Sequence, residues 1–153
     1  MKNSIEVINL SKSYGVKEAV KNINFKIAEN EIIGLLGPNG CGKTTTIGML
    51  LGLLKPTKGD VLINGMRIEE NRINILKRIN FISPYIELPK KLTVKQNLIV
   101  YGKLYNIKNL EERIEYLTEK LRLSELLDRI TGELSSGQKN RASLAKALIN
   151  KPK

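Results

Sequence analysis

The sequence contains no histidine and no tryptophan, and Cys41 is its single cysteine. Without histidine the chain lacks the commonest metal ligand and the commonest general base of enzymes. One cysteine cannot form an intramolecular disulfide framework. A zinc site and a catalytic triad of the Ser/His or Cys/His kind are therefore both excluded.

Long hydrophobic runs are also missing. The first residues, MKNSIEVINLSKSYG, contain no apolar segment of the signal-peptide kind. The longest apolar stretch, Ile47 to Leu54, is too short to cross a bilayer. We therefore expect a cytoplasmic protein.

Acidic residues are in the minority, with 15 Asp and Glu against 26 Lys and Arg and a formal net charge of +11. This excess favours partners with negative charge, such as nucleic acid, an anionic membrane surface or a polyphosphate ligand. Net charge does not choose among them, and a solvated lysine-rich surface is an equally good explanation. With 153 residues, of which 41% are hydrophobic, the chain is long enough for one domain with its own core.

The hydrophobic pattern predicts strands mainly in the first half of the chain. Ile5 to Leu10 and Val20 to Ile27 alternate apolar and polar side chains, as half-buried strands do. Ile32 to Leu36 is a continuous apolar run, which predicts a strand covered on both faces. Two further short strands are expected, Val61–Ile63, which the turn Asn64-Gly65 closes, and Ile79–Ile82.

Apolar residues at helical spacing dominate the second half. The expected helices are Lys43–Leu54, Glu69–Arg78, Thr93–Tyr105, Glu111–Leu121, Ser124–Ile130 and Ser136–Asn150. Strands followed by a run of helices predict an α/β core with a helical insert.

The segment from Gly37 to Thr44 fits the pattern of a phosphate-binding loop, and it lies between an expected strand and an expected helix. Glycines allow the backbone to turn successive N–H groups toward a phosphate, and the helix N-terminus adds its dipole. Lys43 supplies a mobile positive charge for the β- and γ-phosphates, and the Thr44 hydroxyl suits Mg²⁺. A glycine-rich turn that caps a helix without a ligand is the alternative. The nucleotide-binding residues that we expect in this segment are Gly37, Pro38, Asn39, Gly40, Cys41, Gly42, Lys43, Thr44 and Thr45.

Two segments carry a resemblance to a known family. The stretch GPNGCGKTTTIGMLLGLLKPTKGDVLINGM resembles the Walker A region of the ATP-binding-cassette (ABC) family, including the Pro-Thr-x-Gly turn that follows. Leu134, Ser135, Ser136, Gly137 and Gln138 resemble the family's signature sequence, whose third residue is usually glycine. Without the family, this second segment would be an ordinary helix N-cap. The resemblance extends from residue 5 to residue 153.

The resemblance implies a P-loop NTPase core with an N-terminal antiparallel β subdomain and a helical subdomain. Its expected limits are 1–82 for the β subdomain and phosphate-loop core, 83–135 for the helical subdomain and 136–153 for the signature helix. Tyr14, in a segment that resembles the family's aromatic loop, would stack on adenine; the alternative is an aromatic side chain that covers the edge of a strand. Ser135 and Gly137 would face the γ-phosphate of ATP bound by an opposing subunit.

Two departures from the family affect activity. Where the family has a Gln that approaches Mg²⁺ and senses the transmembrane partner, this chain has Ser83-Pro84-Tyr85, with Pro84 near the expected position. The sequence also ends before the strand that carries the family's Walker B Asp and catalytic Glu. We therefore expect the C-terminal part of the core to be missing, no catalytic residue in this chain, and poor ATP hydrolysis.

The function implied by the resemblance is that of an ATP-binding subunit of an ABC transporter, with ATP and Mg²⁺ as cofactors. Such a subunit would form a homo- or heterodimer, contact a transmembrane permease subunit and lie on the inner face of the cell membrane, without nucleic acid. A soluble ABC-type ATPase that acts on nucleic acid or ribosomes is the alternative that the positive charge would suit. Transport is preferred because the helical segment is short and holds no coiled-coil arm or zinc-binding insert. A nucleotide-binding fragment without hydrolytic activity is a third possibility.

Overall fold

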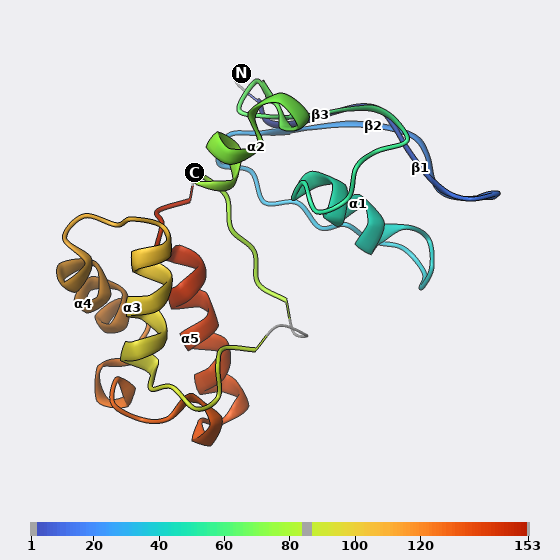
Figure 1. The fold of residues 1–153 in the computed structure, drawn as a ribbon. Helices are drawn as coiled ribbons and strands as arrows, with labels where there is room; N and C mark the ends of the chain where they lie inside the picture. Colours follow the sequence, from blue (N-terminus) through green and yellow to red (C-terminus); the bar gives the residue numbers. More distant parts are fainter. Residues whose placement is uncertain (1–2, 84–86, 153) are drawn as a thin grey trace. The chain divides into compact units, whose positions relative to one another are not determined.

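The computed structural model describes residues 3–83 and 87–152. The chain divides into two compact units, Met1–Leu76 and Lys77–Lys153. In Figure 1 the first unit runs from blue to green and the second continues through yellow to red. The substitution of Pro84 for the family's usual Gln, and the neighbouring Tyr85, lie outside the described residues.

The first unit contains a four-stranded antiparallel sheet in the order β2-β1-β3-β4. Its strands are β1 (Asn3–Tyr14), β2 (Lys17–Ala28), β3 (Lys58–Ile63) and β4 (Met66–Arg67). The three predicted strands of this region lie within β1, β2 and β3, which confirms them. The turn Asn64-Gly65 joins β3 to β4 as predicted, and both of its residues have the positive φ that a tight hairpin turn of this type requires.

Two helices complete the first unit, α1 (Lys43–Leu50) and α2 (Ile68–Leu76). Met49 of α1 and Ile75 of α2 are fully buried, as is Leu10 of β1. The expected continuation of α1 to Leu54 is wrong, because Gly52 takes a positive φ and the helix ends there in a turn.

The predicted strands Ile32–Leu36 and Ile79–Ile82 are not formed. A strand needs a neighbour for its backbone N–H and C=O groups, and neither segment joins the sheet of the described residues. Ile32 is 100% exposed and Leu36 is 91% exposed, so the apolar run that predicted a buried strand is uncovered. The hydrophobic pattern is that of a core segment, but no described segment pairs with it.

The second unit is helical and consists of α3 (Val94–Leu104), α4 (Leu110–Lys120) and α5 (Ser136–Leu148) with two short 3₁₀ helices. All three α-helices are where the sequence predicted them. Their apolar faces meet in one core built from Leu88, Val94, Leu98, Ile114, Leu117, Leu123, Leu134, Ala142, Ala145 and Ile149.

The helix predicted at Ser124–Ile130 is wrong. Only Ser124–Leu126 forms a 3₁₀ turn, and the chain beyond it is used to start α3. The carbonyl of Arg129 accepts from the N–H of Val94 at 3.1 Å, and that of Leu127 accepts from Lys95 at 2.9 Å. These carbonyls satisfy donors at the N-terminus of another helix, which local periodicity does not reveal.

Candidate functional site

The phosphate loop is shaped by glycines held in left-handed conformations. Gly40 has φ 81° and Gly42 has φ 95°, values that other residues adopt at a cost. A Cβ atom at Gly42 would lie 2.4 Å from the carbonyl oxygen of Ala19, so this position also has no room for a side chain. Glycine at 42 therefore lets the loop approach the start of β2 directly.

Lys43, the first residue of α1, folds its side chain back over the loop. Its ammonium group donates to the carbonyl oxygen of Gly37 at 2.6 Å and to that of Pro38 at 2.7 Å. The same nitrogen lies 3.9 Å from the Sγ of Cys41. The loop thus holds a positive charge against its own backbone.

The N-terminus of α1 adds to this positive field. Its N-cap, Gly42, has no side chain that could bond the free N–H groups of the first turn. The helix ladder begins with the N–H of Thr46, which donates to the carbonyl of Gly42 at 2.8 Å. The N–H groups of Lys43, Thr44 and Thr45 precede this ladder and can donate to an anion, which the helix dipole also favours.

A cavity of about 340 Å³ opens beside the loop, within the range of about 300–1,000 Å³ usual for small-ligand sites. It joins the β1–β2 hairpin to the loop and to α1, and its lining consists of Tyr14, Lys17, Ala19, Asn39, Gly40, Gly42, Lys43, Thr44 and Thr45. The structure thus places Tyr14 on the same cavity as the loop. Gly37, Pro38 and Cys41 belong to the loop but do not line this cavity.

Lys17 and Ala19 are cavity residues that the sequence reasoning missed. A signal for them was available in the hairpin, because Tyr14 pairs with Lys17 across the short turn of Gly15 and Val16. A residue that pairs directly with a candidate ligand contact lies on the same face of the sheet. Pairing of the two strands was predictable, whereas its register was not.

Tyr14 is held from one side by Lys12. The Lys12 ammonium lies 5.3 Å from the centre of the Tyr14 ring and donates to the carbonyl of Lys55 at 2.7 Å. Tyr14 is still 50% exposed and faces the cavity, whose lining does not include Lys12. An exposed, laterally supported aromatic ring beside a phosphate loop suits a planar base.

Acidic groups are missing from this cavity. None of the residues that line it carries a carboxylate, and the described parts of the chain contain no group of three or more His, Cys, Asp or Glu that could hold a metal ion. Thr44 is the hydroxyl residue at the helix start, exposed and in the lining. It offers one oxygen ligand of the kind Mg²⁺ accepts, so an ion here would depend on phosphate oxygens and water for the rest.

The signature segment begins α5 with a capping box. The backbone N–H of Gln138 donates to the Ser135 Oγ at 3.3 Å, and the Ser135 N–H donates to the Gln138 Oε1 at 2.8 Å. Leu134, just before the cap, is buried in the helical core. Ser135 and Gln138 thus bond backbone N–H groups at the helix N-terminus, and Leu134 anchors that terminus in the core.

Ser136 and Gly137 are the exposed residues of the first turn of α5. A Cβ atom at Gly137 would meet nothing within 4 Å. Glycine costs a helix about 1 kcal/mol relative to alanine, so the fold gives no reason for it here. A residue that weakens its own element without a packing need is typical of a functional site.

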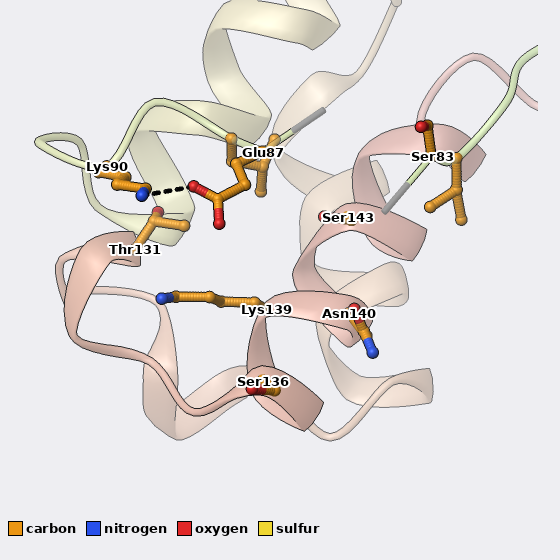
Figure 2. A pocket seen from close by; sticks show the side chains of 10 residues that line it. Ser83, Glu87, Lys90, Thr131, Ser136, Lys139, Asn140 and Ser143 are labelled. Carbon is orange, nitrogen blue, oxygen red and sulfur yellow. Dashed lines mark ion pairs between the residues drawn. The ribbon is translucent and has the colours of Figure 1, made fainter. Parts of the chain in front are cut away.

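A second cavity, of about 490 Å³, lies in the helical unit and is shown in Figure 2. Ser136, Lys139, Asn140 and Ser143 of α5 line one side of it. The remaining lining residues are Ile82, Ser83, Glu87, Leu88, Lys90 and Thr131. This cavity therefore includes residues on both sides of the segment where the family usually has its Gln.

Charge in this second cavity is arranged around one carboxylate. Lys90 forms an ion pair with Glu87 at 2.6 Å, drawn as a dashed line in Figure 2. The hydrogen bond and charge of Lys90, with a smaller contribution from the charge of Lys139, lower the pKa of Glu87 below its ordinary value. Two lysines and one glutamate leave the cavity with an excess of positive charge.

Comparison with known proteins identifies the family. Residues 20–153 match the family described as ABC transporter, and the chain belongs to this family. Over 153 residues it is 37% identical to the Nod factor export ATP-binding protein I of Rhizobium sp. (strain N33). This alignment covers 99% of this chain and 50% of that protein. Over 155 residues it is 37% identical to the bacitracin transport ATP-binding protein BcrA of Bacillus licheniformis, covering 99% of this chain and 49% of BcrA.

Solved structures confirm the fold class. The chain superposes on CbiO1 from Clostridium perfringens, described as part of the ABC transporter complex CbiONQ, with a TM-score of 0.86 and 28% identity, over 100% of this chain and 64% of CbiO1. An ATP-binding subunit of another ABC transporter gives a TM-score of 0.85 at 27% identity, over 97% of this chain and 62% of that one. The fold is thus the N-terminal part of the ABC ATPase fold, and the chain spans about half the length of the curated relatives it matches. Among the described helices, none has the length and apolar character needed to cross a membrane.

Proposed function

We propose that this chain is the nucleotide-binding part of an ATP-binding subunit of an ABC transporter, in which ATP binding and hydrolysis drive transport across a membrane. The observation that carries the proposal is the cavity in which Tyr14 and the phosphate loop meet. The Tyr14 ring can stack on a base, and the positively charged loop can bind phosphates. Because both line one cavity, the site suits a nucleoside triphosphate. Family membership and the names of the relatives support transport as the process that this site serves.

Tyr14, Lys43 and Thr44 have separate roles in this proposal. Tyr14 stacks on adenine, and the amides at the start of α1 receive the phosphates. Lys43 exchanges its bonds to the carbonyls of Gly37 and Pro38 for bonds to β- and γ-phosphate oxygens. Thr44 would hold Mg²⁺, which neutralises charge on the same oxygens when bound.

The signature segment acts, in this proposal, on a second nucleotide. Ser135 and Gly137 lie at an exposed helix N-terminus whose field favours an anion, and the bare backbone at Gly137 leaves room for close approach. We propose that they face the γ-phosphate of ATP held by the opposing subunit of a homo- or heterodimer. This dimer would act with a transmembrane permease subunit at the cytoplasmic face of the membrane, and nucleic acid has no part in it.

The test of nucleotide binding is the variant Lys43→Ala, measured by titration calorimetry with ATP and ADP. Loss of hydrogen bonds to a charged group is worth about 1.5–3 kcal/mol, so we expect the Kd to rise by about 10- to 100-fold. Lys21→Ala removes an exposed charge from β2 and serves as the control, with an unchanged Kd. Unchanged affinity in a folded Lys43→Ala chain would contradict the proposed site.

A further inference from the structure

We propose that Lys17 is a second cationic contact for the bound nucleotide, placed between the base and the terminal phosphates, where it binds the α-phosphate. The inference rests on the proposed ATP-binding function and adds a residue to its site. Lys17 begins β2 and lines the cavity of the phosphate loop.

The hairpin directs Lys17 to the same face as Tyr14. Tyr14 ends β1 and Lys17 begins β2, and their Cα atoms are partners in the antiparallel ladder. Residues directly opposite each other in such a ladder project from the same face, with Cβ atoms about 4.5–5.5 Å apart. The lysine stem is long enough to extend from beside the Tyr14 ring into the cavity.

The other end of the same strand face leads to the phosphate loop. Ala19 lies two residues beyond Lys17, so the two side chains share a face of β2, and both line the cavity. The backbone of Ala19 lies against Gly42, where a Cβ atom would come within 2.4 Å of the Ala19 carbonyl oxygen. Lys17 is thus bracketed by Tyr14 on one side and by the loop on the other.

The chemistry of a nucleotide matches this order. When the base stacks on Tyr14 and the terminal phosphates lie at Gly40–Lys43, the ribose and α-phosphate occupy the space between them. Lys43 is assigned in the proposed function to the β- and γ-phosphates, for which its ammonium would leave the carbonyls of Gly37 and Pro38. In the described lining, Lys17 and Lys43 are the cations and no carboxylate neutralises them. An ammonium group is a compact charge that suits a single phosphate.

The experiment compares Lys17→Met with Lys21→Met, since both remove one positive charge from β2 and only Lys17 lines the cavity. Calorimetry with ATP and ADP gives the Kd directly, and displacement of a fluorescent ADP analogue gives that of pyrophosphate, which has no α-phosphate and no base. We expect Lys17→Met to raise the Kd for ATP and for ADP by about five- to tenfold, because the contact is charge-assisted but partly exposed to solvent. The Kd for pyrophosphate should change by less than twofold. Lys17→Arg should retain most of the affinity, and Lys21→Met should match the unmodified chain.

The controls separate this inference from the proposed function. If the unmodified chain fails to bind ATP, or if the Lys43→Ala variant binds ATP as tightly as the unmodified chain does, the proposed function is wrong. If Lys43→Ala loses affinity while Lys17→Met and Lys21→Met behave alike, the role of Lys17 is wrong and the ATP site stands. If Lys17→Met weakens pyrophosphate as much as ATP, Lys17 acts on the terminal phosphates, and the α-phosphate assignment is overturned. Thermal unfolding of each variant confirms that it is folded.

Discussion

Gly42 and Gly137 stand in the two motifs of the chain and differ in their surroundings. At Gly42 a side chain would strike the carbonyl of Ala19, and the backbone has a positive φ. At Gly137 the backbone is helical and the space around it is open. The first glycine is required for the loop to form, whereas the second leaves the backbone at a helix end uncovered. Glycine thus serves the fold at position 42 and, in the proposed function, nucleotide recognition at position 137.

Cys41 gives a test of the loop at the residue scale. Its thiol is exposed, within the loop, and 3.9 Å from the Lys43 ammonium. A nucleotide in the loop would draw the Lys43 side chain to its phosphates and cover the thiol, so saturating Mg-ATP should slow alkylation by at least about tenfold. The rate is followed by mass spectrometry with a small maleimide. The Lys43→Ala chain is the control, because weak binding should abolish the protection, and equal rates with and without Mg-ATP in the unmodified chain would count against the loop geometry.

The helices α3 and α5 begin with the same device. Thr93 and Gln96 form a capping box at α3, with bonds of 2.9 Å and 3.1 Å, as Ser135 and Gln138 do at α5. In both helices the side chains satisfy donors at the N-terminus that the helix ladder leaves free. The box at α5 coincides with the signature segment, so its structural and proposed functional roles overlap. The box at α3 has no such overlap and is a matched reference.

We expect Ser135→Ala and Thr93→Ala to lower the free energy of unfolding by similar amounts, about 1 kcal/mol each, because each removes one N-cap acceptor. Urea denaturation followed by circular dichroism measures both. Neither change should alter the Kd for ATP in the isolated chain, since neither side chain lines the phosphate-loop cavity. A weaker Kd in Ser135→Ala alone would mean that the signature contacts nucleotide within one chain, contrary to the proposed action across a dimer.

At the scale of the whole molecule, the phosphate loop and the signature segment belong to different compact units. The phosphate-loop cavity contains two lysines and no carboxylate among its described residues. Such a site can hold a triphosphate, since binding needs amides and cations. Hydrolysis also needs a positioned water and a base to activate it, and general base catalysis contributes about 10²- to 10⁴-fold to a rate.

We therefore expect this 153-residue chain to bind ATP but to release phosphate slowly. The measurement is phosphate release at saturating Mg-ATP, with a full-length relative such as BcrA assayed in parallel. Turnover by the chain should be at least about 100-fold slower than that of the longer protein, because no carboxylate faces the described cavity. Equal turnover, abolished by Lys43→Ala, would show that a catalytic base lies within this chain and that its absence was wrongly inferred.

Much of this structure follows from local sequence. The helix after the phosphate loop was predicted from glycine spacing and apolar periodicity, and α1 begins at Lys43 as expected, although the strand expected before the loop is not formed. The turn Asn64-Gly65 and the start of α5 at Ser136 also follow from short signals, a positive-φ pair and a capping box. Such features depend on residues a few positions apart, whose interactions are the same in most surroundings.

Tertiary structure decided what depends on distant partners. The segment Ile32–Leu36 has the pattern of a buried strand, yet no described segment pairs with it. The carbonyls of Leu127 and Arg129 accept hydrogen bonds from the first residues of α3, and this segment does not form the predicted helix. Lys17 lines the cavity because the strand register places it opposite Tyr14 and because the Ala19 backbone lies against Gly42. Backbone hydrogen bonds and cavity walls are shared between segments far apart in the chain. Their partners are selected only when the chain has folded, so composition and periodicity alone do not determine them.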